Sequence, residues 1–253
     1  MGILKTNSEQ QIIDFVEKTE DKKILKQFEH HNFPTMHEPY YLGSMGIYLF
    51  KKEALFKLLE MDAREDFGKH LIPTQVKNGK TFSYHYKGYW EDIGTILSYY
   101  QANMALTRQK TDLTLYDEKS PIFTTHQNLP GPKIFGTKIE NSIISEGSIV
   151  EADLISHSVL GTRTIINKGT VIKDSYIFGN DYYTPPTPSK KQAKQFQIGQ
   201  NCLITKAIID KHVHIGDNVE LTNKNQLDHY TSDDIYIRDG IIIVTRGAVI
   251  PDG

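Results

Sequence analysis

The first 108 residues alternate between short apolar runs and segments in which apolar residues recur every three or four positions. Short runs bounded by turn residues predict β-strands, and the longer spacing predicts amphipathic helices. Strands are expected at residues 2–5, 11–17, 40–50, 81–86 and 89–91, and helices at 20–30, 52–61, 67–77 and 96–108. This alternation is typical of a mixed α/β domain.

The first two strands are predicted to form a hairpin around the polar turn Asn7-Ser8-Glu9. Apolar side chains fall on both faces of strand 11–17, so this strand is expected to be central in its sheet. Three helices have an expected N-cap, namely Thr19, Asp66 and Thr95. The apolar stripes expected to face the core are Leu55, Leu58 and Leu59, then Leu71 and Ile72, then Ile96, Tyr99, Tyr100 and Met104.

The second half of the chain has a six-residue period. Single aliphatic residues recur six positions apart at Ile143, Ile149 and Ile155, at Ile165, Val171 and Ile177, and at Leu203, Ile209, Ile215 and Leu221. Such a period fits no single helix face, and a β-sandwich would need alternation within strands of unequal spacing. It predicts a parallel β-helix with one inward residue on each short side. Glycines expected at its corners, where a positive φ is useful, are Gly147, Gly169, Gly199 and Gly216.

The expected fold class is therefore α/β plus all-β. Residues 1–108 form a mixed-sheet domain, 109–133 a linker rich in turn residues, and 134–253 a β-helix that mediates oligomerisation. A loop leaving the coil is expected at residues 179–191, either as a tolerated insertion or as a contact to a subunit or ligand. A further hairpin is expected within residues 235–246.

Composition narrows the function. The formal charge of -2 and the pI near 6.6 give no indication of a nucleic-acid surface. A single cysteine fits a reducing compartment, and apolar runs such as residues 241–244 are too short to span a bilayer. Gly2 with Thr6 matches the short myristoylation pattern, but no second membrane signal accompanies it. A soluble cytoplasmic protein without nucleic-acid or membrane partners is expected.

Candidate chemistry lies at the ends of strands. Glu17 and Lys18 follow a buried strand, either as a solvated pair or as a ligand site at the strand's carboxyl end. Ser44, between Gly43 and Gly46, either binds a hydroxyl group or sits in a bulge. Asp92 precedes a helix, where spacing alone favours a structural cap over a ligand for a metal or sugar.

The two expected strands of the late hairpin each carry an arginine, Arg238 and Arg246. Exposed arginines are usually solvated. A pair of them could also bind one phosphate, because guanidinium groups match phosphate oxygens in a bidentate manner.

Several motifs occur in the same order as in ADP-glucose pyrophosphorylase, that is, glucose-1-phosphate adenylyltransferase, and the chain resembles this family over nearly its whole length. The motifs are Glu17-Lys18, Gly43-Ser44-Met45-Gly46-Ile47-Tyr48, Asp66-Phe67-Gly68, Trp90 to Thr95, Ala102-Asn103, Ile208 to Lys211, and Ile237-Arg238 with Gly240-Ile241. The resemblance is closest to the cyanobacterial and plant branch. It implies a partial mixed-sheet nucleotidyltransferase domain followed by a left-handed parallel β-helix.

The resemblance implies that ADP-glucose and pyrophosphate form from ATP and glucose 1-phosphate, for glycogen or starch synthesis. Lys18 would hold the sugar phosphate, Glu17 and Ser44 the glucose hydroxyls, and Asp92 a Mg²⁺ ion, which makes Asp92 and Lys18 the catalytic pair. It further implies a homo- or hetero-tetramer and a phosphorylated metabolite as effector. Arg246, where plant-like members have an effector-binding lysine, and Arg238 are the effector candidates.

Two departures from the family pattern stand out. Thr19 replaces a common proline, and the family's amino-terminal half, with its GGxGTRLxPLT nucleotide loop, is missing from these 253 residues. The chain is expected to be the carboxyl-terminal part of such an enzyme and to form no ADP-glucose alone, with ATP as a partner only if the missing half is supplied. Alternatives are a non-catalytic regulatory or scaffold subunit, and a hexapeptide acyltransferase using His157, His212 or His214.

Overall fold

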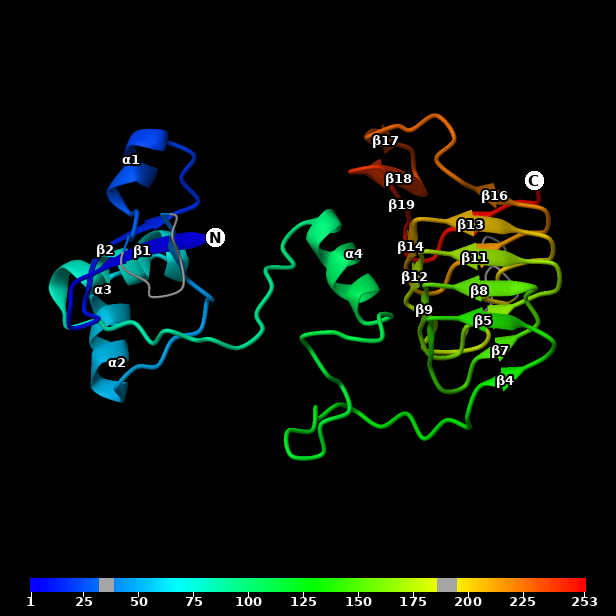
Figure 1. Ribbon diagram of the computed structural model, residues 1–253, viewed down its shortest axis with the longest axis horizontal. Helices are drawn as coiled ribbons and strands as arrows, with labels where there is room; N and C mark the ends of the chain where they lie inside the picture. The colour runs from blue at the N-terminus through cyan, green and yellow to red at the C-terminus, as the bar shows by residue number, and fades with distance from the viewer. Residues whose placement is uncertain (32–38, 186–194) are drawn as a thin grey trace. The chain divides into compact units, whose positions relative to one another are not determined.

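The computed structural model describes residues 1–31, 39–185 and 195–253 (Figure 1). These residues form two compact units, Met1–Asp92 and Ile93–Gly253. Residues 32–38, between the expected helix 20–30 and the expected strand 40–50, lie outside the described residues, as does the stretch 186–191 of the expected loop leaving the coil. No helix of the described parts is both long and apolar enough to cross a bilayer.

The first unit is built around a three-stranded antiparallel sheet in the order β2-β1-β3. The strands are β1 (Gly2–Thr6), β2 (Ile12–Glu17) and β3 (Leu42–Gly43). The helices are α1 (Lys22–Gln27), α2 (Lys52–Met61), the π-helical turn η1 (Phe67–Leu71) and α3 (Ile72–Asn78). Its core contains Leu4, Ile12, Phe15 and Ile72, so α3 packs against the hairpin.

The predicted hairpin is confirmed, but the central strand is β1 rather than β2. A β-bulge is the physical reason. Leu4 pairs with Phe15 and Thr6 pairs with Ile12, so one extra residue lies in β2 between them. The bulge brings Ile12 and Phe15 to the same buried face and leaves Ile13 52% exposed. Strand β2 therefore buries one apolar face and not the two that the sequence predicted.

Three expected strands are wrong or much shortened. Of residues 40–50 only Leu42–Gly43 forms a strand, and Tyr40 adds an isolated bridge to His30. The positive φ of Gly46 (+70°) turns the chain away after β3. Residues 81–86 contribute one isolated bridge, from Phe82 to Gln11 beside β2, and residues 89–91 form no strand. An extended segment becomes a strand only where a partner backbone accepts its hydrogen bonds.

The helices follow the sequence more closely. Helix α2 has the predicted bounds, although only Leu58 of its expected core stripe is buried. Helix α1 is shorter than expected, and its N-cap is Asp21 rather than Thr19, since the Asp21 side chain accepts a hydrogen bond from the Lys23 N–H. Asp66 caps its helix as predicted. Leu71 and Ile72 are buried as predicted.

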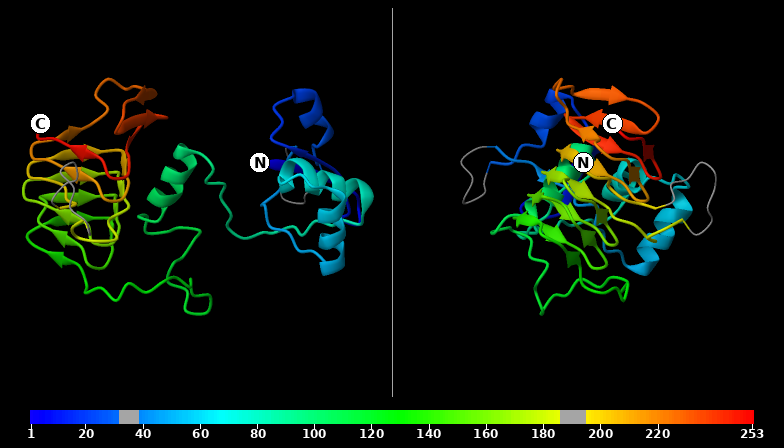
Figure 2. Two further views of the ribbon diagram at one scale, coloured as in Figure 1. Left: turned by 180° about the vertical axis from the view of Figure 1, so that it is seen from behind. Right: turned by 90° about the vertical axis from the view of Figure 1, so that its right-hand side faces the viewer.

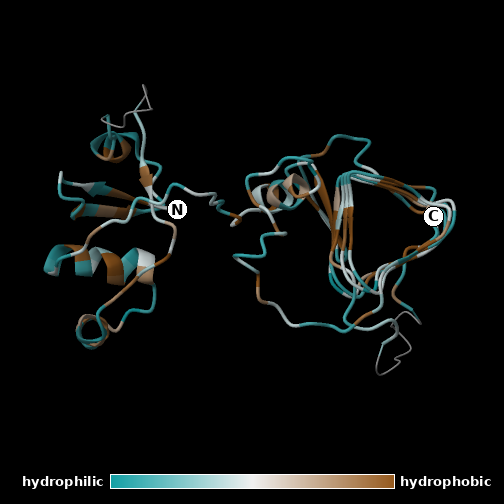
Figure 3. Ribbon diagram, turned by 60° about the horizontal axis from the view of Figure 1, so that its bottom comes forward, coloured by the Kyte–Doolittle hydropathy of each residue, from teal (hydrophilic) through white to brown (hydrophobic). Residues whose placement is uncertain are grey.

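The second unit is dominated by a left-handed parallel β-helix with three sheets (Figures 1 and 2). Strands stack coil upon coil, as where Ile149 pairs with Ile165 and Leu154 pairs with Val171. Figure 3 looks nearly along this stack and shows its three-sided outline. The strands are β4 (Lys133–Ile134), β5 (Lys138–Glu140), β6 (Ile143–Ile144), β7 (Ile149–Val150), β8 (Leu154–Ser156), β9 (Val159–Leu160), β10 (Ile165–Ile166), β11 (Val171–Lys173), β12 (Tyr176–Ile177), β13 (Leu203–Thr205), β14 (Ala207–Ile209), β15 (His214–Ile215), β16 (Glu220–Leu221), β17 (His229–Thr231), β18 (Ile235–Arg238), β19 (Ile241–Val244) and β20 (Val249–Ile250).

The predicted inward-pointing residue is correct on some sides of the coil, and on others the residue that points inward is the next one along the chain. The paired positions above are 16 and 17 residues apart, so at least one of the three sides of a coil has fewer than six residues. Five predicted positions lie in the core: Ile155, Ile177, Ile209, Ile215 and Leu221. At the other five the next residue points inward: Ile144, Val150, Ile166, Ile172 and Ile204.

The corners also differ from expectation. Gly147 and Gly169 have positive φ as predicted, whereas Gly199 and Gly216 do not. A Cβ atom on Gly199 would overlap the carbonyl oxygen of Gly216 in the next coil, so close approach of the backbones requires this glycine. Many left-handed corner positions carry other residues, namely Asn141, His157, Arg163, Asp174, Asn201, Lys206, His212 and Asn218.

The late hairpin is confirmed. Strand β18 pairs antiparallel with β19 through Asp239 and Gly240, both with positive φ as a tight two-residue turn requires. Strand β19 then rejoins the coil by pairing with β14, and β17 adds an outer strand to β18.

Helix α4 (Ile96–Ala105) belongs to the second unit. Thr95 caps it as predicted, with a reciprocal hydrogen-bond pair to Ser98. The Tyr100 hydroxyl donates to the carbonyl oxygen of Asp174 at 2.7 Å, and burial raises the pKa of Tyr100 to about 12. Tyr99 stacks on Phe178 with ring centroids 6.0 Å apart. The helix therefore packs on the side of the β-helix formed by β12 and β14.

Candidate functional site

The first unit contains a cavity of about 630 Å³ that is lined by Glu17, Lys18, Ser44 and Asp92. These residues come from three separate stretches of the chain. The structure therefore brings together the four residues that the sequence singled out for sugar-phosphate and metal binding.

Glu17 ends β2, and Lys18 follows it with a φ of +47°. The Lys18 N–H donates to the carbonyl oxygen of Met1 at 3.4 Å, which extends the β1–β2 register by one position. The left-handed backbone of Lys18 then turns the chain out of the sheet. The Glu17 carboxylate lies against Gly2 and Gly68, since a Cβ atom on either glycine would crowd it. Two glycines thus make room for one acid at the edge of the cavity.

Ser44 directly follows β3, and its N–H donates to the carbonyl oxygen of Gly2 at 2.8 Å. Its hydroxyl lies 3.2 Å from the Tyr48 hydroxyl and 3.4 Å from the Gly46 nitrogen. Gly43 and Gly46 therefore flank a turn that follows β3, and Ser44 does not lie in a bulge of a long strand. The paired hydroxyl groups of Ser44 and Tyr48 can exchange hydrogen bonds with a polar ligand.

Asp92 lies in an irregular segment between the last residues of the first unit and α4. Thr95, and not Asp92, caps α4. The capping role that spacing alone favoured for Asp92 is therefore taken by another residue, and Asp92 lines the cavity.

Further cavity residues were not predicted as site residues: Tyr48, Glu65, Asp66, Phe67, Lys69 and Trp90. Phe67 stacks against Tyr48 with ring centroids 6.3 Å apart. Asp66 accepts a hydrogen bond from the Lys69 N–H at 2.9 Å, which holds the pKa of its carboxyl below the ordinary value. Asp66-Phe67 and Trp90 lie inside the motifs that resemble the pyrophosphorylase family. These motifs are the sequence feature from which their place at the cavity could have been predicted.

The cavity is compatible with a Mg²⁺ ion that arrives with phosphate. No group of three or more His, Cys, Asp or Glu side chains in the described residues could hold a metal ion without further ligands. Mg²⁺ usually binds through one or two carboxylates together with phosphate oxygens and water. Carboxylates such as Asp92 at the cavity can supply the protein's share of such a site.

Two family models match the chain. The model described as the GLGC left-handed parallel beta-helix domain matches residues 127–253, which is half of the chain. The chain belongs to this family. A second model, described as Nucleotidyl transferase, matches residues 1–109. Together they confirm the predicted fold class of a nucleotidyl transferase domain followed by a left-handed β-helix.

The GLGC β-helix keeps the two effector candidates apart. Arg238 lies opposite Ile241 at the turn, whereas Arg246 lies beyond the other end of β19, roughly 16 Å along an extended strand. Arg238 donates to the Tyr230 carbonyl oxygen at 2.7 Å and to the Thr231 hydroxyl at 3.0 Å. The two guanidinium groups are therefore not placed to bind one phosphate together.

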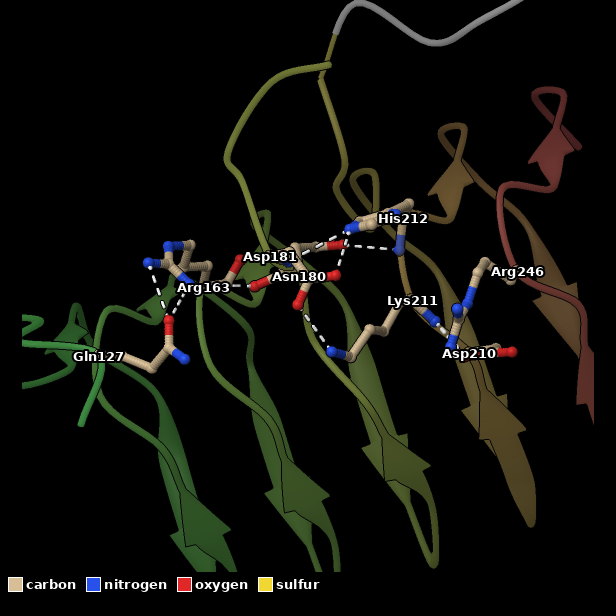
Figure 4. A network of polar contacts seen from close by, with 8 residues as sticks. All are labelled: Gln127, Arg163, Asn180, Asp181, Asp210, Lys211, His212 and Arg246. Carbon is tan, nitrogen blue, oxygen red and sulfur yellow. Dashed lines mark hydrogen bonds and ion pairs between the residues drawn. The ribbon is translucent and has the colours of Figure 1, made fainter. Parts of the chain in front are cut away.

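Arg246 instead belongs to a polar network along one corner of the GLGC β-helix (Figure 4). Its guanidinium lies 3.6 Å from the Asp210 carboxylate. The neighbouring Lys211 ammonium lies 2.6 Å from the Asp181 carboxylate, and His212 Nε2 lies 3.2 Å from the other oxygen of Asp181.

The three histidines considered for acyl transfer have structural partners. His157 Nδ1 lies 2.9 Å from the Ser156 hydroxyl, and His214 Nδ1 lies 2.9 Å from the carbonyl oxygen of Gln195. The His212 ring stacks with the rings of Phe196 and Tyr182, with centroids 4.9 and 6.2 Å away.

Proposed function

We propose that the cavity of the first unit binds glucose 1-phosphate and forms the sugar-phosphate side of a glucose-1-phosphate adenylyltransferase site. One observation carries this proposal. Glu17, Lys18, Ser44 and Asp92, the four residues that the motifs of the sequence point to, line a single cavity. Its volume of about 630 Å³ lies within the range of small-molecule sites.

The chemistry of the cavity suits a phosphorylated sugar. The Lys18 ammonium is a compact positive charge with three donors and is suited to a phosphate group. The Glu17 carboxylate accepts hydrogen bonds from sugar hydroxyls, and the Ser44 hydroxyl can donate or accept them. Trp90 and Phe67 supply aromatic surface at the same cavity.

In the proposed reaction, a phosphate oxygen of glucose 1-phosphate bonds to the α-phosphorus of ATP. The bond from that phosphorus to the oxygen bridging to the β-phosphate breaks, and pyrophosphate leaves with the bonding electrons. Lys18 would hold the attacking phosphate in place, so most of the rate enhancement comes from positioning. Asp92 would be the protein ligand of Mg²⁺, whose charge stabilises the phosphates when it is bound.

The ATP side of the reaction needs groups that these 253 residues do not contain, because neither half carries the glycine-rich nucleotide loop. We propose that the chain transfers adenylyl groups only when a nucleotide-binding half is supplied. The same proposal includes tetramer formation through the β-helix, a phosphorylated effector at Arg246, and a weaker role for Arg238.

The test is calorimetric titration of the purified chain with glucose 1-phosphate. Lys18→Gln should weaken binding by about tenfold or more, because it removes the charge facing the phosphate. Lys23→Gln, an exposed lysine on α1 outside the cavity, is the matched control and should bind like the wild type. Glucose, which lacks the phosphate, should bind all three proteins equally weakly.

Equal glucose 1-phosphate affinity in the Lys18 and Lys23 variants would remove Lys18 from the site. Absence of binding to the wild type would overturn the proposal for the cavity as a whole. ADP-glucose formation by the chain alone would contradict the requirement for a nucleotide-binding half.

A further inference from the structure

Positive and negative side chains alternate along one corner of the β-helix (Figure 4). Successive coils bring Arg163, Asp181, Lys211 and Arg246 to this corner, because β9, β12, β14 and β19 are stacked in that order. The chain therefore collects three permanent cations here from segments far apart in sequence.

The central cation is held by a carboxylate of the protein itself. The Lys211 ammonium and the Asp181 carboxylate are 2.6 Å apart, and their side chains are 32% and 48% exposed. This hydrogen bond is the main reason that the pKa of Asp181 lies below its ordinary value, and His212 and Arg246 act in the same direction. Asp181 is thus the anion that holds Lys211, whereas Arg246 pairs with a second carboxylate, Asp210.

The backbone at this corner is fixed independently of that ion pair. The Asn180 side chain is buried, accepts from the His212 N–H at 2.9 Å and donates to the carbonyl oxygen of Arg163 at 3.1 Å. The Asp181 N–H donates to His212 Nε2 at 3.2 Å. Removing the charge of Asp181 therefore leaves the frame of the corner in place.

We infer that Asp181 is an internal competitor that occupies this basic corner and must be displaced before a phosphorylated anion binds there. The inference rests on the proposed effector role of Arg246 and adds its regulation, an autoinhibitory carboxylate supplied by the preceding coil. An incoming phosphate replaces Asp181 at Lys211, next to the Arg246–Asp210 ion pair of the adjoining coils. Exposed ion pairs contribute little stability, so the exchange is open to a multiply charged ligand.

The expected consequence is that an anion binds at this corner only if it carries at least two negative charges. A singly charged anion gains no more from Lys211 than Asp181 already does, whereas a ligand with two or more charges outcompetes it. Asp181 would thus select ligands by charge and weaken the binding of all of them. Substituting Asp181 with a neutral residue of the same shape should strengthen anion binding.

The experiment is calorimetric titration of the full chain with pyrophosphate, at low and high salt. Asp181→Asn should bind pyrophosphate about tenfold more tightly than the wild type, since it removes one negative charge next to the ligand. Asp153→Asn changes the net charge by the same amount in a strand connection on another side of the coil, and it should bind like the wild type. Lys211→Gln combined with Asp181→Asn should lose the gain.

Equal affinity of the Asp181→Asn and Asp153→Asn variants would overturn the inference, as would absence of pyrophosphate binding to both wild type and Asp181→Asn. A gain that persists without Lys211 would also overturn it. Adding Lys18→Gln to the wild type and to Asp181→Asn separates the two proposals, because Lys18 lines the cavity and not the corner. The gain in pyrophosphate affinity from Asp181→Asn should remain in this background, and its loss would overturn the inference. Equal glucose 1-phosphate affinity of the wild type and Lys18→Gln would count against the cavity alone.

Discussion

Lys18, the residue proposed to hold the sugar phosphate, has an uncommon backbone conformation. Its φ of +47° lies in the left-handed region, which few residues other than Gly, Asn and Asp adopt readily. The sequence singled out Lys18 because an acid and a base followed a buried strand. It gave no indication of the backbone conformation, which depends on the contact of β2 with Met1. Strain of this kind is frequent where a side chain must be aimed at a ligand.

A second residue, Asp62, was not noticed in the sequence but joins two helices. It follows α2 and is 8% exposed. Its carboxylate accepts hydrogen bonds from Arg64 at 2.7 and 2.6 Å and from the Thr74 hydroxyl on α3 at 3.0 Å. The Arg64 hydrogen bonds hold the pKa of Asp62 well below its ordinary 3.8, against the opposing effect of burial.

Asp62→Asn is expected to lower the melting temperature of the first unit by a few degrees at neutral pH. Because the folded-state pKa is depressed, the carboxylate stabilises the fold above the unfolded value of 3.8, and this contribution fades as pH falls further. Thermal unfolding from neutral to strongly acidic pH should therefore show the two proteins converging below pH 3.8. Asp112→Asn, at an exposed position, is the control; a gap that does not change with pH would contradict this account.

At the scale of elements, the sequence predicted where helices form more reliably than it predicted which strands pair with one another. Helix α2 and the caps at Asp66 and Thr95 could be read because local side chains decide them. The bulge that places Ile12 and Phe15 on one face could not, since it depends on pairing with β1. The β-helix was recognised from its period, but the inward residue was misplaced by one where a side is shorter than six residues. Glu17, Lys18, Ser44 and Asp92 line one cavity, as the sequence motifs suggested, and their roles stay predictions. That Tyr48 and Lys69 lie at the same cavity could be seen only from the fold.

The corners of the β-helix are expected to tolerate no added volume where coils touch. Gly199→Ala should destabilise the second unit by about 3 kcal/mol or more, because the new methyl group meets the backbone carbonyl of Gly216. Gly131→Ala, with open space around it, should change stability by less than about 1 kcal/mol. Urea unfolding followed by circular dichroism measures the stability of both variants. Similar unfolding midpoints would show that neighbouring coils move apart to accept the methyl group at residue 199.

At the scale of the molecule, the chain consists of two units with separate cores. Helix α4 covers apolar surface of the second unit around Tyr176, Phe178 and Ile208. The predicted first domain, residues 1–108, includes this helix, as does the Nucleotidyl transferase model over residues 1–109. Its tyrosines pack on the β-helix, and no sequence pattern shows which of two cores a helix will join.

A fragment of residues 93–253 is therefore expected to fold cooperatively without the first unit. A shorter fragment, residues 109–253, should melt at a lower temperature and self-associate more, because it leaves the surface beneath α4 uncovered. Thermal unfolding and sedimentation of the two fragments provide the comparison. Equal melting temperatures and equal association states would show that α4 does not stabilise the β-helix.

The way β19 rejoins the stack has a practical consequence. Val244 pairs with Ile209, although the chain between them has passed through an entire outlying hairpin. The hairpin outside the coil can therefore vary in length and composition while the pairing of β14 with β19 stays in register. The tip at Asp239-Gly240 is a natural position at which to graft a foreign peptide epitope onto this frame.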